Sequence, residues 1–297
     1  MKASSFTHYE PTSIEQAVMI LADVADQDGR ILAGGQTLVP AMALRLARPG
    51  FLVDINRIEE LRRLIVDGDD LVISACVRHC AFHNRVVDGP LGSLLSTVVR
   101  HIAHLPIRTR GTFCGSLANA DAASEWCLVT ATLDATMTAS SVHGERRVAA
   151  VEFFIGFMTT ALEPDELLVS VRLPLLSEHT HFGFEEFSRR AGDFAQAMAL
   201  VVFELHGGRM SAVRIGVGGV EGIARRIGAA EACLEGEVPG KDIFLRAAHT
   251  AAAAVDPTDA EPEHQRYRRD LVMTVVQRAL SKAVSGLSIA TRPRSDL

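Results

Sequence analysis

The sequence predicts an α+β protein built from two domains. The chain has 297 residues, which is long for one hydrophobic core and comfortable for two. Its first part alternates helical and strand patterns around two glycine-rich loops, whereas its last part has strand patterns followed by helical ones. Hydrophobic residues make up 48% and charged residues 22%, so a packed protein is expected rather than a disordered one.

The chain opens with a small α/β unit. Thr12 and Ser13 are good N-cap residues, with acidic and amide side chains three positions later, and apolar residues then recur at helical spacing as far as Val24. Short apolar strands follow at residues 30–33 and 51–55, with a glycine turn and a short helix between them. The predicted order is helix, strand, glycine turn, short helix, strand.

The middle of the chain is predicted to continue the first domain. An Asp-Gly turn between two apolar runs indicates a hairpin at residues 64–66 and 71–73. Helical patterns and further strands are expected at residues 91–104, 124–133, 135–139 and 166–173. We therefore expect a first domain of residues 1–176, with subdomains of about 1–57 and 58–176.

A second, smaller domain is predicted for residues 177–297, after a linker at 174–180. Strands are expected at residues 182–188, 197–205 and 211–217. Helices are expected at residues 225–234, 243–255 and 265–283. Strands followed by helices favour an antiparallel sheet with helices on one face.

Charge and composition exclude several classes of function. The net charge is −6 with acids and bases interspersed, which argues against a nucleic-acid partner. No run is long enough to span a bilayer and the start has no apolar signal core, so we expect a cytoplasmic protein. Five cysteines without paired spacing predict neither a disulfide scaffold, a metal site nor an iron–sulfur cluster.

The first glycine loop begins where the second predicted element ends. It has the sequence Leu32-Ala33-Gly34-Gly35-Gln36-Thr37-Leu38. Glycines let backbone amides approach an anion closely, and consecutive amides can surround it as a nest. A tight turn without a ligand explains the Gly-Gly pair equally well. The loop lacks the three spaced glycines of a Rossmann fingerprint and the Gly-Lys-Ser/Thr of a P-loop.

The second glycine loop covers residues 107–121 and crowds small and hydroxyl side chains together. Such composition suits backbone that lies against a large flat ligand, although tight packing alone is the alternative. Arg108 and Arg110 are more readily explained as a solvated or salt-bridged face than as phosphate ligands. His79, His83, His101 and His104 are expected on polar helix faces, and no catalytic residue is assigned.

Together the two loops resemble those of a known family. Residues 33–40, followed by Asp54-Ile55, are similar to the flavin-binding medium subunit of aerobic carbon monoxide dehydrogenases, within the xanthine dehydrogenase or molybdenum hydroxylase family. Residues 107–112 and 115–121 are similar to its second flavin motif, and the likeness continues through 166–168, 189–195 and 267–269. It therefore covers nearly the whole chain.

The resemblance implies a fold, a cofactor and partners. The fold would be a two-subdomain FAD-binding domain of the p-cresol methylhydroxylase type, followed by a smaller α+β domain. FAD would be bound non-covalently by this chain. A small subunit with two [2Fe–2S] clusters and a large molybdopterin subunit would be partners, usually in a dimer of heterotrimers. Electrons would pass from the clusters through FAD to a final acceptor.

The resemblance also implies which residues touch the cofactor. Residues 33–37 would surround the FAD pyrophosphate, flanked by Leu32 and Leu38. The flavin and ribityl chain would be lined by Thr112, Cys114, Gly115, Ser116 and Asn119. Glu125 stands where the family usually has an acidic residue near the cofactor, and Leu168 and Ile107 would line the flavin pocket.

Three departures from the family pattern bear on the site. Cys114 replaces the first of two adjacent glycines, Ala122 replaces a proline, and Glu185 or Glu186 replaces a lysine. Two alternatives remain: a stand-alone flavoenzyme of the same fold, and a flavin-free assembly subunit for which Cys114 is the best support. The organic substrate stays open among carbon monoxide, purines and aromatic N-heterocycles, and the final acceptor stays open as well.

Overall fold

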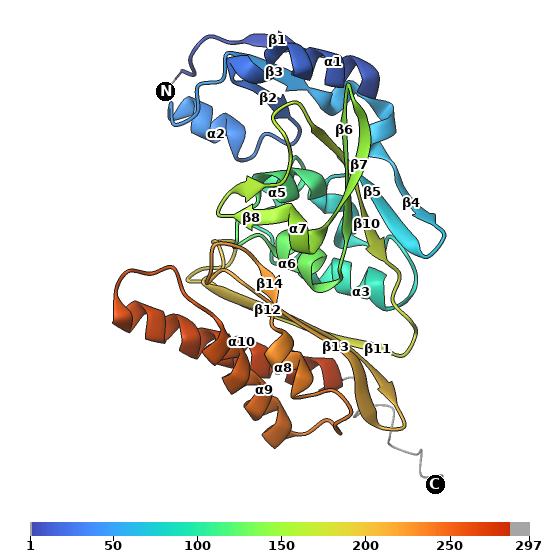
Figure 1. The fold of residues 1–297 in the computed structure, drawn as a ribbon, viewed down its shortest axis with the longest axis vertical. Coiled ribbons are helices and arrows are strands. Elements are labelled where there is room, and N and C mark those ends of the chain that lie inside the picture. The colour runs from blue at the N-terminus through green and yellow to red at the C-terminus, as the bar shows by residue number, and fades with distance from the viewer. Residues whose placement is uncertain (1, 286–297) are drawn as a thin grey trace. The chain divides into compact units, whose positions relative to one another are not determined.

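A computed structural model describes residues 2–285 as two compact units (Figure 1). Of the described residues, unit 1 comprises 2–87, 102–121 and 134–175, and unit 2 comprises 88–101, 122–133 and 176–285. Helices and sheets are mixed in both, as the α+β prediction requires. Residues 88–101 and 122–133 belong to unit 2 together with the C-terminal part of the chain. A domain boundary between residues 176 and 177 therefore stays a prediction.

The opening of unit 1 is a three-stranded parallel sheet with two helices. Its strands are β1 (Thr7–Tyr9), β3 (Phe51–Asp54) and β2 (Gly29–Leu32), in that order. Helix α1 (Ile14–Val24) begins where predicted, because the Ser13 hydroxyl accepts a hydrogen bond of 3.2 Å from the Gln16 amide. Helix α2 (Leu38–Ala43) follows the first glycine loop.

The rest of unit 1 is built around a five-stranded antiparallel sheet. Its order is β4 (Leu64–Asp67), β5 (Asp70–Ser74), β10 (Leu167–Pro174), β6 (Thr136–Ser141) and β7 (Gly144–Ala149). A small hairpin pairs β8 (Phe154–Gly156) with β9 (Thr159–Thr160). The remaining helices are α4 (Leu105–Arg108), α5 (Phe113–Asn119) and α7 (Ala150–Phe153), with 3-10 turns at Ala25–Gln27, Ile55–Arg57, Glu59–Arg62 and His79–His83.

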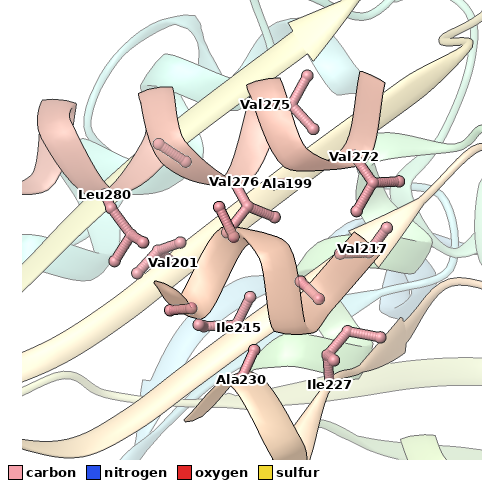
Figure 2. Close-up of a cluster of buried hydrophobic side chains, with 14 of the residues drawn as sticks. Ala199, Val201, Ile215, Val217, Ile227, Ala230, Val272, Val275, Val276 and Leu280 are labelled. Carbon is pink, nitrogen blue, oxygen red and sulfur yellow. The ribbon is translucent and has the colours of Figure 1, made fainter. Parts of the chain in front are cut away.

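Unit 2 contains the predicted antiparallel sheet. Its order is β11 (Thr180–Phe187), β12 (Ala197–His206), β13 (Arg209–Gly218) and β14 (Arg225–Arg226). The helices are α3 (Gly89–Val98), α6 (Glu125–Thr132), α8 (Gly228–Ala232), α9 (Lys241–Ala254) and α10 (Pro262–Ser285). Figure 2 shows alternate residues of the sheet, such as Val201 and Ile215, packing with Val272 and Val276 of α10.

Helices cover both faces of this sheet, so the expectation of helices on one face was wrong. The intervening residues of β12 are equally buried, and on that side Gly216 of β13 lies against Thr132 and Leu128 of α6. Helix α3 contacts β11 on the same face, where His101, just after α3, packs edge-on against Phe184. A strand that is apolar on both sides needs cover on both sides, and segments far away in the sequence supply it.

Two further expectations about elements need correction. The helix expected at residues 225–234 is the short strand β14 followed by the single turn of α8, because Arg225 and Arg226 pair with Glu221 and Glu231 beside the sheet edge. The helix expected at residues 91–104 ends with α3 at Val98. Within residues 2–285, no helix is long and apolar enough to cross a membrane.

Candidate functional site

The first glycine loop joins β2 to α2 within unit 1 (Figure 1). Leu32 ends the strand and Leu38 begins the helix, so the predicted contact residues between them form the connection. Gly35 has a φ of 69°, a backbone conformation that residues with a side chain rarely adopt. In the described part of the chain, the backbone amides of residues 34–37 donate no hydrogen bond to another residue. Four successive free amides can receive an anion.

The second glycine loop is more helical than expected. Ile107 lies in the short helix α4, and Gly115, Ser116 and Asn119 lie in α5. Thr112 caps α5, since its hydroxyl accepts a hydrogen bond of 3.0 Å from the Gly115 amide. That cap requires a glycine, because a Cβ at Gly115 would lie 2.6 Å from Thr112 Oγ1.

The two loops meet backbone to backbone. A Cβ added to Gly34 would lie 2.6 Å from the carbonyl oxygen of Arg110 and 2.7 Å from the Cα of Gly111. No real Cβ approaches backbone atoms this closely, so the contact exists only because position 34 is glycine. The structure therefore brings the two predicted motifs together in one unit.

His79 lies beneath the second loop. The expectation that it lies on a polar helix face was therefore wrong. Its side chain is buried, and its amide donates a 3.0 Å hydrogen bond to the carbonyl of Gly111. Burial, together with the charges of Arg78 and Arg108, lowers the pKa of His79 to about 4. The imidazole is therefore neutral at physiological pH.

Arg108 has a structural role. Its guanidinium donates hydrogen bonds to the carbonyl oxygens of Ile102 and Ala103, at 2.6 and 2.8 Å, and to His83 Nε2 at 3.1 Å. These bonds tie α4 to the segment before it, so Arg108 is held by backbone carbonyls and His83 rather than lying on the solvated or salt-bridged face that had been expected. Arg110 is exposed at the end of the same segment.

Cys114 points into the core of unit 1. Its Sγ lies 3.5 Å from the carbonyl oxygen of Ile73 in β5, and the side chain is buried. Burial raises the pKa of the thiol, and the nearby Cys76 raises it further, so the sulfur stays protonated. The residue is the second of helix α5, where an ordinary side chain is tolerated, so the change from glycine imposes no unusual backbone shape.

The last two predicted contact residues lie in different units. Leu168 is buried in β10, a strand of unit 1 that contacts α5, beside a break in its pairing with β6. Glu125 begins α6 in unit 2 and is largely buried there. Among residues 2–285, no three His, Cys, Asp or Glu side chains lie close enough to hold a metal ion.

Sequence reasoning missed Asn56, whose side chain bonds to the first loop, and Arg78, whose side chain bonds to the second. Asn56 follows the Asp54-Ile55 pair that was noted as part of the first motif, so its place after β3 was a usable signal. Arg78 stands between β5 and a 3-10 turn and carries no sequence signal of its own.

Comparison with known proteins identifies the family. Residues 4–176 match the family described as "FAD binding domain in molybdopterin dehydrogenase", and residues 182–283 match "CO dehydrogenase flavoprotein C-terminal domain". The alpha subunit of the 6-hydroxypseudooxynicotine dehydrogenase complex of Paenarthrobacter nicotinovorans is 38% identical over 285 residues, covering 96% of each chain. The carbon monoxide dehydrogenase medium chain of Hydrogenophaga pseudoflava is 31% identical, covering 94% of this chain and 96% of that one.

A solved structure supports the same assignment. A chain of carbon monoxide dehydrogenase from Hydrogenophaga pseudoflava superposes with a TM-score of 0.90 at 34% sequence identity. The superposition covers 95% of this chain and 98% of that chain, so it extends over both units. The chain therefore belongs to the family of FAD-binding medium subunits of molybdenum-containing oxidoreductases.

Proposed function

We propose that the two loops of unit 1 hold one non-covalently bound FAD. The amides of residues 34–37 would donate to the pyrophosphate, and Thr112, Gly115, Ser116 and Asn119 would line the flavin and ribityl chain. The observation that carries this proposal is the run of four amides without a hydrogen-bond partner in the described chain, placed against the second loop.

The residues present fit such a cofactor. Gly34 and Gly35 leave the backbone uncovered where a side chain would clash or be strained. Cys114 is turned into the core, so its thiol does not occupy the space beside the loops. Leu32, Leu38, Ile107, Glu125 and Leu168 remain predicted contacts of the same cofactor, and Cys114 remains one through its backbone alone.

We further propose that the chain is the electron-transfer subunit of a heterotrimer. Bound FAD would supply the chemistry, accepting electrons from partner [2Fe–2S] clusters and releasing them to a final acceptor, while this chain binds and orients it. The relatives that match end to end are named as a subunit of a dehydrogenase complex and as a medium chain. A molybdopterin subunit, a dimer of heterotrimers and a cytoplasmic location complete the proposal.

Anaerobic stopped-flow spectroscopy at the flavin absorption band tests this role. We expect no rapid bleaching when the isolated chain is mixed with an organic substrate of the complex. Adding the iron–sulfur and molybdopterin subunits should restore substrate-dependent bleaching. Rapid bleaching of the isolated chain would instead favour a stand-alone flavoenzyme, and a colourless chain that takes up no FAD would favour an assembly subunit.

A further inference from the structure

Asn56 links the first loop to the strand beside it. Its Nδ2 donates a hydrogen bond of 2.7 Å to the carbonyl oxygen of Ala33, next to the run of free amides. The same side chain is held in place by Asp54, whose Oδ1 accepts from the Asn56 amide at 2.9 Å and from Nδ2 at 2.6 Å. The orientation of Asn56 is therefore fixed at both of its ends.

Arg78 continues this link to the second loop. One terminal nitrogen of its guanidinium donates to Asn56 Oδ1, and the other donates to the carbonyl oxygen of Arg110. Partial burial lowers the pKa of Arg78, but the guanidinium stays charged and strengthens both bonds. The Arg110 carbonyl oxygen is the atom that a Cβ at Gly34 would approach most closely in the contact between the loops.

A continuous chain of side-chain hydrogen bonds thus joins the carbonyl of Ala33 to the carbonyl of Arg110. Backbone bonds secure the Arg78 end, since the His79 amide donates to Gly111 and the Phe113 amide donates to Val77, both at 3.0 Å. All these residues belong to unit 1. These hydrogen bonds use the carbonyl oxygens of Ala33 and Arg110 as acceptors and leave the backbone amides of residues 34–37 without a partner in the described chain.

We propose that Asn56 and Arg78 form a brace that sets the spacing of the two glycine loops and thereby the affinity for FAD. They are positioning residues, since they act through the loop backbone. The inference rests on the proposed FAD site. Its physical basis is preorganisation: loops already held at the bound spacing lose less conformational entropy when the cofactor binds.

The test measures FAD affinity of the full-length apo-chain by quenching of flavin fluorescence. We expect Arg78→Ala and Asn56→Ala each to weaken binding by about 10- to 100-fold, the range for loss of a charge-assisted hydrogen bond. The double variant should bind no worse than about the weaker single variant, because either change breaks the same chain of bonds.

Arg62→Ala is the matched control. Arg62 donates to the backbone carbonyl of Asn56 and to Glu59 at 2.7 Å, so the change removes a nearby positive charge without touching either loop. FAD affinity close to that of the wild type is expected. Arg78→Lys keeps the charge but loses the planar fork, so it should bind nearly as weakly as Arg78→Ala.

Several outcomes would overturn the brace while FAD binding by the wild type stands. These are wild-type FAD affinity in both single variants, an affinity loss in the double variant equal to the product of the two single losses, or wild-type FAD affinity in Arg78→Lys. Thermal unfolding of the apo-proteins is measured in parallel, and variants that lose only stability while keeping the wild-type Kd also overturn it. If the alanine variants do not fold, Arg78→Lys and Asn56→Asp carry the same test. A wild-type chain that binds no FAD would refute the proposed site and the brace together.

Discussion

We expect Glu186 to make the stability of unit 2 dependent on pH. It lies on the face of β11 that contacts α3, its side chain is 4% exposed, and Oε2 has no hydrogen-bond partner among the described residues. The nearest basic atom is His101 Nδ1 at 3.7 Å, and burial together with Lys282 lowers the pKa of that imidazole. Burial, followed by the charges of Glu125 and Glu185, raises the pKa of Glu186 to about 8.

A raised pKa means that the folded protein keeps a proton that the unfolded chain loses near pH 4.5. The free energy of unfolding therefore falls as the pH rises from about 4.5 to about 8 and levels off above that. Glu186→Gln keeps the shape of the protonated carboxyl and cannot ionise. At 1.36 kcal/mol for each pKa unit, the variant should be more stable than the wild type by roughly 5 kcal/mol at pH 9 and about equal at pH 4.5.

Differential scanning calorimetry of both proteins between pH 4.5 and 9 measures this difference. Since 1 kcal/mol shifts the Tm of a domain of this size class by about 2–4 °C, the variant should melt roughly 10–20 °C higher at pH 9. Glu185→Gln is the control, because Glu185 pairs with Lys282 at 2.6 Å and Arg278 at 3.2 Å on the other face of the strand. That change should lower the Tm at pH 9. A Glu186→Gln variant whose Tm advantage does not grow with pH would refute the reasoning.

Three further predictions concern the loops. Gly34→Ala should abolish FAD binding by forcing the two loops apart. Gly228→Ala is the control, because its added Cβ meets nothing within 4 Å, and it should bind FAD normally. Equal FAD content of the two purified variants would contradict the close contact between Gly34 and the second loop. Gly35→Val should also lose FAD, because a β-branched residue is strained at a φ of 69°; normal binding would exclude this loop as the pyrophosphate site. Cys114→Gly should keep FAD but lower the Tm, since it removes a buried side chain from α5. Acid precipitation of the wild type or of this variant should release yellow FAD into the supernatant. Flavin that stays in the pellet would show a covalent link.

Local sequence patterns were sufficient to predict much of this protein's secondary structure. The N-cap at Ser13 and the apolar spacing after it specify α1, and the Asp-Gly turn specifies the β4–β5 hairpin, because these signals act between residues close in the chain. The two glycine loops were recognised in the same way. Composition alone left the glycine pair open between an anion site and a tight turn, and the resemblance to the family favoured the FAD site, which stays a prediction.

Tertiary structure decided what depends on residues distant in the sequence. Contact of Gly34 with Gly111 and the inward orientation of Cys114 toward Ile73 follow from how strands and helices pack, which no local pattern encodes. Residues 88–101 and 122–133 join the C-terminal sheet for the same reason, since its second apolar face must be covered. Arg78 illustrates the limit most clearly: a charged residue without a motif acquires its role only when folding places the Arg110 backbone carbonyl and the Asn56 side-chain oxygen within reach of one planar guanidinium.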